Sequence, residues 1–251
     1  MTLVVPARAK LNLDLAILAR RNDGFHEVST HMQAIALHDL LELRQVDRTN
    51  LTTTGHQVPE AANNSVLKAH AKMQEAAGRE LPTHFHLDKR IPPGSGMGGA
   101  SSDAAAAMKG LAALHNLKVD LTKIAEQVGT DVPFFLAGGA ARAEGRGERL
   151  TQVPTEPAWF AIAWPGIELS TTAVYRAWDE VNGDGRNQLA RAAAHIEPRV
   201  QNFAMRLGRD WQMTGSGSAF FLRCTDERSA QTAITTLDCW AAVTHAVGPW
   251  A

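Results

Sequence analysis

The residues best suited to chemistry lie between Pro92 and Asp103, where four glycines stand within six positions. Glycine leaves the backbone N–H groups of a loop open to close approach by a ligand. An alanine-rich segment with helical periodicity follows directly, and the start of a helix adds free N–H groups and the positive end of the helix dipole. These features favour a phosphate site, to which the hydroxyl groups of Ser101 and Ser102 could add contacts to the phosphate or to a cation bound to it.

Two named phosphate motifs fit this loop only in part. Gly94 and Gly99 match Walker A, but Ala100 stands where that motif requires lysine. The dinucleotide pattern is met by Gly94, Gly96 and Gly99, with Asp120 at a suitable distance, yet prolines replace the buried strand that should lead into the first glycine. Asp120 is equally explained as a helix N-cap. The loop is therefore either a flexible, capped connection or a phosphate-binding loop of a third kind.

Polar residues elsewhere could complete a site, although each also has an ordinary explanation. Lys10 and Asn12 lie on the polar face of an alternating strand over 10–18, which could simply face solvent. Asp131 stands just before Pro133, where it could only cap a short helix. His84 and His86 share one strand face, but no third ligand at motif spacing accompanies them, and no metal site is assigned.

An aromatic pair stands at the edge of a predicted turn. Asn22, Asp23 and Gly24 have the composition of a hairpin turn, and Phe25 and His26 follow at once. Such a pair could clamp a ligand or could belong to ordinary packing. A second glycine turn over 215–218 offers the same choice between a ligand contact and a plain hairpin.

The composition excludes several classes of protein. The chain has 251 residues, of which 45% are hydrophobic, and its formal net charge is −1, so no broad electrostatic attraction to nucleic acid is expected. No apolar run approaches the ~20 residues of a membrane span, and the first ten residues lack the layout of a secretory signal. Cys224 and Cys239 form no disulfide framework. We expect a cytoplasmic enzyme without membrane or nucleic-acid partners.

The elements that must position these residues follow from periodicity and punctuation. Strands are predicted over 10–18, 34–37, 41–46, 84–87, 158–164, 219–223 and 240–247, with a hairpin over 140–153. Helices are predicted over 66–77, 104–114, 121–128, 171–181, 187–196, 199–207 and 227–237, and a short one after Asp131. A boundary at 154–157 divides the chain into domains 1–153 and 154–251. The second domain is predicted to be a small α+β sandwich.

Taken together, the motifs resemble those of the GHMP kinases. The 92–102 loop resembles their ATP loop, and residues 215–219 resemble their C-terminal glycine motif. Residues 10–13, 23–26, 129–135 and 143–148 are similar to one family within them, which acts on a cytidine diphosphate polyol. Each match alone is weak to moderate, but their joint order from about residue 6 to residue 223 is a specific signal.

The resemblance implies a fold and a reaction. The fold is a two-domain α+β GHMP kinase, with an N-terminal domain like domain 2 of ribosomal protein S5 and a C-terminal ferredoxin-like α/β sandwich. The reaction is ATP-dependent phosphorylation of the 2-hydroxyl of 4-diphosphocytidyl-2-C-methyl-D-erythritol, in non-mevalonate isoprenoid biosynthesis. ATP and Mg²⁺ are the implied cofactors, the partners are small molecules, and the chain is a monomer or a homodimer.

The resemblance also implies roles for individual residues. Lys10 and Asp131 correspond to the catalytic lysine and the catalytic base. The substrate contacts are Asn12 at the polyol, Phe25, His26 and Tyr175 at the cytosine, and Thr171, Gly215 and Ser216. The ATP contacts are Asn64, Lys89, Pro93, Gly94, Ser95, Gly96, Met97, Gly98, Gly99, Ala100, Ser101, Ser102 and Asp103.

The chain departs from the family pattern in places. Phe25 stands where tyrosine is common, Asp103 stands where asparagine also occurs, Arg8 falls within an altered entry to the first strand, and the 182–210 segment is short. None of these removes a catalytic group. The competing functions are another small-molecule GHMP kinase, such as a homoserine or mevalonate kinase, and an NAD(P)-dependent oxidoreductase. The latter leaves Lys10 and Asp131 without roles.

Overall fold

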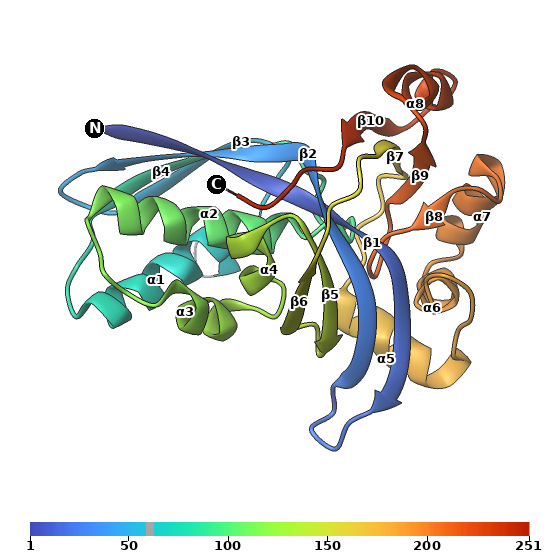
Figure 1. The fold of residues 1–251 in the computed structure, drawn as a ribbon, viewed down its shortest axis with the longest axis horizontal. Coiled ribbons are helices and arrows are strands. Elements are labelled where there is room, and N and C mark those ends of the chain that lie inside the picture. Colours follow the sequence, from blue (N-terminus) through green and yellow to red (C-terminus); the bar gives the residue numbers. More distant parts are fainter. Residues whose placement is uncertain (59–62, 251) are drawn as a thin grey trace.

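The computed structural model describes residues 1–58 and 63–250, which form two units, each built on one sheet (Figure 1). The larger sheet has the order β3-β4-β2-β5-β6, with β1 paired to β2. Its neighbouring strands are antiparallel, except for β3 and β4, which are parallel. The strands are β1 (Thr2–Arg20), β2 (His26–Gln45), β3 (Asn50–Gly55), β4 (Thr83–Lys89), β5 (Ala140–Gly145) and β6 (Arg149–Val153).

The first two strands are much longer than the sequence predicts. The strand expected over 10–18 is the middle of β1, and the two strands expected over 34–37 and 41–46 are one strand, β2. Register shifts interrupt the β1–β2 pairing at three places, at Arg8/Lys10, Asn12/Asp14 and Ile17/Ala19. Each shift changes which side chains face the core, so simple alternation fails although the strand continues.

Four helices cover one face of the large sheet (Figure 1). Asn64 and Asp120 cap two of them as local sequence suggests, because each side chain accepts a hydrogen bond from a first-turn N–H group. The run Ala104–Ala107 is buried, and Gly110 touches Leu43 so closely that a Cβ atom would lie 2.6 Å from its Cδ1. These small residues let the central helix, α2, pack close to the sheet. The helices are α1 (Ser65–Ala77), α2 (Gly99–Leu114), α3 (Leu121–Val128) and α4 (Val132–Ala137).

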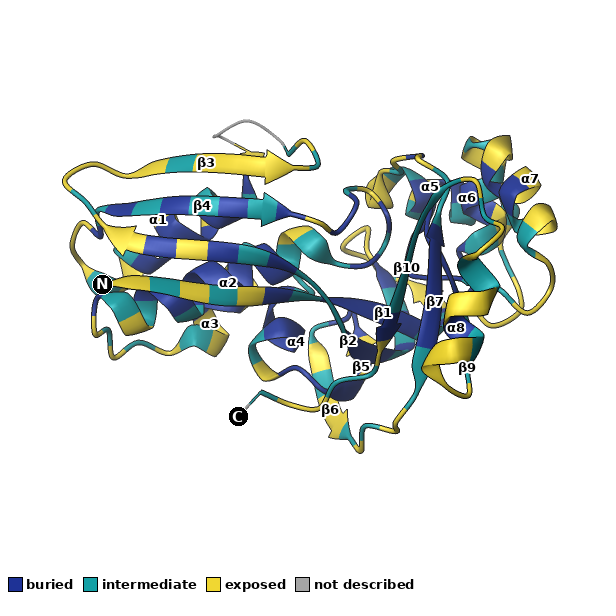
Figure 2. Ribbon diagram, turned by 90° about the horizontal axis from the view of Figure 1, so that it is seen from above, coloured by how far each residue is buried: buried dark blue, intermediate teal, exposed yellow. Residues whose placement is uncertain are grey.

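The second unit contains a four-stranded antiparallel sheet in the order β10-β7-β9-β8. Figure 2 shows β7 buried along most of its length, whereas β3 is exposed at the edge of the large sheet. The strands are β7 (Trp159–Trp164), β8 (Gln212–Met213), β9 (Phe220–Cys224) and β10 (Trp240–His245). The helices are α5 (Thr171–Val181), α6 (Ala190–Ile196), α7 (Pro198–Leu207) and α8 (Glu227–Ile234).

Most of these elements match their predicted ranges, and α6 shows why one differs. The helix predicted from residue 187 begins at Ala190 instead. Asn187 is held outside it, because its side-chain amide donates hydrogen bonds to the carbonyl groups of Met213 and Gly215, at 2.8 and 2.9 Å. These contacts tie the start of α6 to the second glycine turn.

The β1–β2 hairpin belongs to both units. Leu15, Ile17 and Val28 pack in the core of the second unit. The backbone N–H of Leu15 donates to the carbonyl of Arg186 at 2.8 Å, and that of Leu37 donates to Thr244 Oγ1 at 2.9 Å. The predicted boundary at 154–157 falls between the two sheets in sequence, but side-chain packing crosses it. The division into domains 1–153 and 154–251 stays a prediction.

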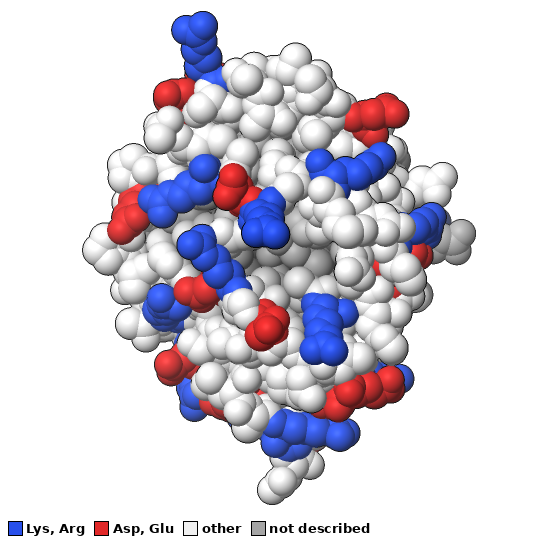
Figure 3. All heavy atoms as spheres, turned by 90° about the vertical axis from the view of Figure 1, so that its right-hand side faces the viewer, with Lys and Arg blue, Asp and Glu red and all other residues white. Residues whose placement is uncertain are grey.

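The surface carries mixed charge on the face drawn in Figure 3. Basic and acidic side chains are interspersed there, without a broad region of one sign. This agrees with the formal net charge of −1. Among the helices of the described residues, none combines the length and apolar character needed to cross a bilayer.

Candidate active site

A cleft of about 1340 Å³ lies between the two units. It collects residues that are far apart in sequence, including all but two of those to which the sequence assigns a role. These are Lys10, Asn12, Phe25, His26, Asn64, Lys89, Pro93, Gly94, Ser95, Gly96, Gly98, Gly99, Ala100, Ser101, Asp103, Asp131, Thr171, Tyr175, Gly215 and Ser216.

Hydrogen bonds hold the glycine loop against both units. Gly94 O accepts from Ser218 N at 3.2 Å, and Met97 O accepts from Lys10 N at 3.0 Å. A Cβ atom on Gly96 would lie 2.3 Å from the backbone oxygen of Thr214, just before the second glycine turn, and Gly96 has a φ of +80°. Glycine is needed here for close approach and for left-handed backbone geometry. The loop is therefore fixed in place and not a flexible connection.

Helix α2 begins at the end of this loop with its first N–H groups uncapped. Its N-cap residue, Gly98, has a φ of 73° and offers no side-chain cap. Ala100 and Ser101 in the first turn line the cleft, so the helix start faces it. This is the arrangement that binds phosphate at a helix N-terminus.

Two predicted ATP contacts have side chains directed elsewhere. The Met97 side chain is fully buried in an apolar cluster, and Ser102 lines a separate pocket beside α2. Neither residue is part of the cleft lining. Helical periodicity explains Ser102, because a side chain one position after Ser101 points about 100° away around the helix.

Lys10 and Asp131 meet beside the glycine loop. Their Nζ and Oδ2 atoms are 3.9 Å apart, and the Lys10 side chain is 5% exposed against 32% for Asp131. Lys10 Nζ also donates to Gly96 O at 2.9 Å. Burial lowers the pKa of Lys10, and the nearby Asp131 carboxylate opposes this shift. Asp131 precedes α4 but makes no side-chain capping bond, so the capping explanation of this residue is wrong.

Asn12 lines the cleft, but its side chain is already engaged. Asn12 Oδ1 accepts a short hydrogen bond from Lys10 Nζ, and Asn12 Nδ2 donates to Thr30 Oγ1 at 2.8 Å. Asn12 thus positions the lysine ammonium group. The second glycine turn packs directly against the Lys10 ammonium group, because a Cβ atom on Gly215 would lie 3.2 Å from Lys10 Nζ. Next to it, Ser216 and Thr171 hydrogen bond to each other through their hydroxyl groups at 2.9 Å.

A buried ion cluster lies behind the glycine loop. Lys89 Nζ is 2.5 Å from Asp39 Oδ2 and 2.6 Å from Asp103 Oδ2, and all three side chains are at most 4% exposed. Asp39 Oδ1 also accepts from the N–H groups of Arg90 and Ile91. Asp103 Oδ1 has no partner among the described residues. The cluster fixes the start of α2, which carries Asp103, to strands β2 and β4.

Burial, together with the neighbouring Asp39, raises the pKa of Asp103 to about 7, against the opposing effect of Lys89. Burial alone would lower the pKa of Lys89, but Asp103 and Asp39 together raise it. Two carboxylates that share one ammonium group leave one negative charge without compensation, which a proton on Asp103 removes. Sequence reasoning missed Asp39. The only signal was the polar break at His38 and Asp39 between two apolar runs.

The other end of the cleft is built from aromatic side chains. The His26 ring lies 5.2 Å from that of Tyr175. His26 Nε2 is 2.7 Å from Asp179 Oδ1, a residue of α5 that sequence reasoning also missed. Phe25 is 51% exposed, and the Arg146 guanidinium lies 5.1 Å from the centre of its ring. Burial, with a further contribution from Asp131, raises the pKa of Tyr175.

Asn64 is the N-cap of α1, as its position in the sequence indicates, because Asn64 Oδ1 accepts a hydrogen bond from Val66 N at 2.9 Å. The residue also lines the cleft. His84 and His86 are engaged at the β3–β4 edge by Asn50 and Thr52. Within 1–58 and 63–250, no group of three or more His, Cys, Asp or Glu side chains could hold a metal ion.

Comparison with known proteins places this site in a family. Residues 64–139 match the family model described as the GHMP kinases N terminal domain. A 4-diphosphocytidyl-2-C-methyl-D-erythritol kinase of Moorella thermoacetica is 40% identical over 265 residues, which cover 91% of this chain and 92% of that protein. The enzyme of the same name from Ectopseudomonas mendocina is 38% identical, covering 87% of this chain and 81% of its own.

A solved structure supports the same assignment. The crystal structure of a 4-(cytidine 5'-diphospho)-2C-methyl-D-erythritol kinase superimposes with a TM-score of 0.85 at 33% identity, covering 98% of this chain and all of the other. Sequence likeness and shared fold therefore agree along nearly the whole chain. With the GHMP kinase fold and these relatives established, the chain belongs to the 4-diphosphocytidyl-2-C-methyl-D-erythritol kinase family of the GHMP kinases.

Proposed function

We propose that the protein transfers the γ-phosphoryl group of ATP to the 2-hydroxyl of 4-diphosphocytidyl-2-C-methyl-D-erythritol. One observation carries this proposal. A single cleft holds the Lys10–Asp131 pair beside a glycine loop at one end, and His26 and Tyr175 at the other. A substrate with a nucleobase at one end and an alcohol at the other matches this layout.

The chemistry at the phosphate end follows from charge. Phosphoryl transfer depends on positioning and on neutralising charge more than on covalent help from the protein. The Asp131 carboxylate is free of capping bonds and accepts the proton of the attacking hydroxyl. The Lys10 ammonium, fixed by Asn12 and Gly96, stabilises the transferring group. The N–H groups at the start of α2 hold the ATP phosphates.

At the base end, the contact between His26 and Asp179 orders the imidazole. If Nε2 carries the hydrogen that is donated to Asp179, Nδ1 is left as an acceptor for the exocyclic amine of cytosine. Tyr175 and Phe25 offer ring faces for stacking. Thr171, Gly215 and Ser216 line the same cleft, and Gly215 lies beside Lys10, where the polyol that carries the attacking hydroxyl would bind.

We propose Mg²⁺ as the accompanying metal, bound mainly through the ATP phosphates. No set of side chains in the described residues forms a closed metal site. This fits Mg²⁺, which keeps several waters and uses one or two carboxylates besides substrate phosphates. The Asp131 side chain is 32% exposed and lines the cleft, so its carboxylate could serve as such a ligand. When bound, Mg²⁺ would neutralise phosphate charge.

The deciding experiment measures ATP consumption and product structure. With 4-diphosphocytidyl-2-C-methyl-D-erythritol we expect ADP formation and a new phosphomonoester on the 2-hydroxyl, detected by phosphorus NMR. Homoserine and mevalonate serve as alternative alcohols, and nicotinamide fluorescence monitors any binding of NAD(P)H. Turnover of either alternative alcohol at a higher kcat/KM than the cytidine substrate would overturn the proposal. The oligomeric state, monomer or homodimer, is decided separately by light scattering.

The cellular location belongs to the same proposal. Cys224 and Cys239 are both free thiols, which suits a reducing compartment such as the cytoplasm.

A further inference from the structure

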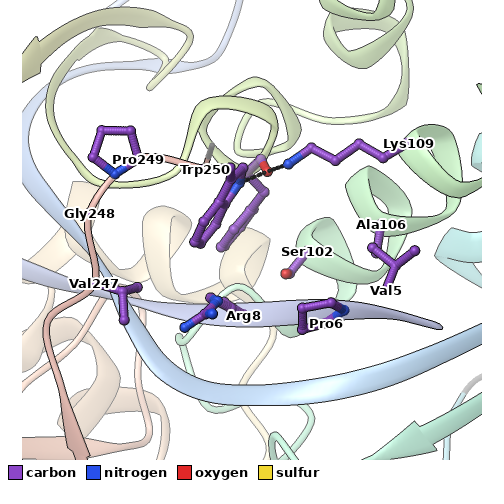
Figure 4. A pocket seen from close by; sticks show the side chains of 11 residues that line it. Val5, Pro6, Arg8, Ser102, Ala106, Lys109, Val247, Gly248, Pro249 and Trp250 are labelled. Carbon is purple, nitrogen blue, oxygen red and sulfur yellow. Dashed lines mark hydrogen bonds between the residues drawn. The ribbon is translucent and has the colours of Figure 1, made fainter. Parts of the chain in front are cut away.

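A second pocket of about 440 Å³ lies on the far side of α2 from the cleft. Strand β1, helices α2 and α4, and the tail after β10 enclose it (Figure 4). Trp250 stands as one wall, with Arg8, Ser102 and Lys109 facing the same space. None of the roles proposed above uses this pocket.

Among the described residues, the pocket brings two cations together with no carboxylate in its lining. Lys109 Nζ lies 5.1 Å and the Arg8 guanidinium carbon 5.2 Å from the centre of the Trp250 ring. No carboxylate of residues 1–58 or 63–250 forms an ion pair with either cation, and the lining contains no Asp or Glu. By contrast, the buried cations Lys10 and Lys89 are each paired with a carboxylate.

Lys109 is held in an unfavourable setting for a lone cation. Its Nζ donates to Phe135 O at 3.2 Å, an oxygen that also accepts from Trp250 Nε1 at 2.8 Å. Burial lowers the pKa of Lys109 to about 8. An ammonium group whose contacts are a shared carbonyl and the face of Trp250 would be stabilised by an anion within reach.

Ser102 supplies a neutral donor in the same pocket. Its side chain is 2% exposed and makes no hydrogen bond within the described part of the chain. In Figure 4 its hydroxyl group points into the space between Arg8 and Trp250. The hydroxyl group can therefore donate a hydrogen bond to a ligand in the pocket.

The remaining walls are apolar, formed by Val5, Pro6, Ala106 and the faces of Phe135 and Trp250. We propose that this pocket binds a small organic anion, with a carboxylate or phosphate head between Lys109, Arg8 and Ser102 and a compact apolar body against Trp250. The inference does not depend on the identity of the kinase substrate. A ligand in this pocket should affect the cleft through Phe135, which lines the pocket and also touches the glycine loop. A Cβ atom on Gly98 would lie 2.7 Å from the Phe135 ring and 3.2 Å from Lys10 Cε.

The test uses phenyl phosphate, hexanoate and inorganic phosphate as probes. Calorimetry is performed on the full chain with ADP at saturation, so that the nucleotide site is occupied. We expect both organic anions to bind at least about tenfold more tightly than inorganic phosphate, because only they fill the apolar part. Lys109→Met keeps the apolar stem and should weaken their binding at least about tenfold. Lys118→Met changes an exposed lysine outside the pocket lining, so it is the matched control and should leave binding unchanged.

A second readout identifies the contact. Binding of phenyl phosphate should raise the pKa of Lys109, followed by NMR of its side chain, because a nearby anion favours the charged form. If Lys109→Met does not fold, Arg8→Gln tests the same head-group site. Absence of binding by both organic probes, equal affinity for inorganic phosphate, or affinity that neither variant changes would each overturn the proposal.

Discussion

The two ends of the cleft are constructed in different ways. The phosphate end is made of backbone and buried charge. The glycine loop is bonded to both units, and Lys89 is enclosed by Asp39 and Asp103 at no more than 4% exposure. The cytidine end is made of side chains from β2, its preceding turn and α5, and Phe25 is 51% exposed. Its main fixed contact is the one between His26 and Asp179.

This difference indicates how reaction and specificity are divided. Backbone geometry and buried ion pairs resist change, since altering one member leaves others without partners. Side chains that meet across two units can be exchanged one at a time. We expect changes at the phosphate end to affect turnover or folding, and changes at the cytidine end to affect only the affinity for one substrate.

The largest effect is expected at Asp131. Asp131→Asn removes the proton acceptor but preserves size, so kcat should fall by about 10²–10⁴ while both substrates still bind. Lys10→Ala should have a similar effect, and the double variant should be little worse, because the pair acts as a unit. Steady-state kinetics and calorimetry make the measurement.

Asp120 provides the control for that experiment. It does cap a helix, accepting from Thr122 N at 3.1 Å. Asp120→Ala should cost about 1 kcal/mol of stability without lowering turnover. Near-normal turnover in a folded Asp131→Asn protein would contradict the proposed mechanism.

The next effect concerns pH and the buried ion cluster. The pKa of Asp103 is about 7 in the folded protein, above the ordinary carboxyl value of 3.8. The folded state therefore holds this proton more tightly than the unfolded state, and the associated stability is present below pH 3.8 and is lost as pH rises through about 7. One proton corresponds to a slope of roughly 1 kcal/mol per pH unit within that window.

Urea unfolding between pH 4 and pH 8 measures this slope, and Asp103→Asn should remove it. Glu180→Gln, an exposed change on α5 near the cytidine end, is the control and should leave the slope as it is. An unchanged slope in Asp103→Asn would show that the cluster does not titrate as described.

At the cytidine end, Tyr175→Ala should raise the KM for the cytidine substrate and leave the KM for ATP nearly unchanged. The loss should correspond to about 1–3 kcal/mol, the range found for a base stacked on an aromatic side chain. Tyr175→Phe keeps the ring and should retain most of the affinity. Equal losses for ATP and the cytidine substrate would remove the distinction between the two ends.

The smallest effect is expected from Asp179→Asn, which weakens the orientation of the His26 ring without removing it. A single hydrogen bond of this kind contributes about 1 kcal/mol, so the KM for the cytidine substrate should rise by less than about tenfold. The kcat should hold, and Glu180→Gln on the same helix should leave both parameters unchanged. A fall in kcat as large as that of Asp131→Asn would show that Asp179 does more than orient the His26 ring.

Local sequence signals predicted the parts of the fold that local forces determine. Asn64 and Asp120 cap helices, and Gly78 ends α1 in a left-handed conformation, as their residue types indicate. The extent of β2 was not predictable from alternation, because the strand passes between two packing environments and its register shifts. Most helix ranges were right to within three residues for the same local reasons.

The sequence predicted most of the residues that the cleft brings together, but not the contacts that support them. The glycine loop is recognisable from its composition alone. Lys10 and Asp131 are 121 positions apart, so the roles proposed for this pair rest on family resemblance and not on any local pattern. Asp39 and Asp179 were missed because their partners lie 50 and 153 positions away. The polar break at His38 and Asp39 was the one local signal for Asp39, and it did not point to Lys89 as a partner.

The long hairpin of β1 and β2 also has a mechanical consequence. Two domains joined by a flexible linker can move widely relative to each other. Here the paired strands β1 and β2 run through both units and pack in the core of each. The register shifts locally disrupt the ladder of hydrogen bonds between the two strands, and two of them flank Lys10 and Asn12. We expect the hairpin to bend at these register shifts when the cleft opens and closes. Because both ends of the hairpin are packed in a core, the motion should be small, and Lys10 should return to the same position beside the loop after each turnover.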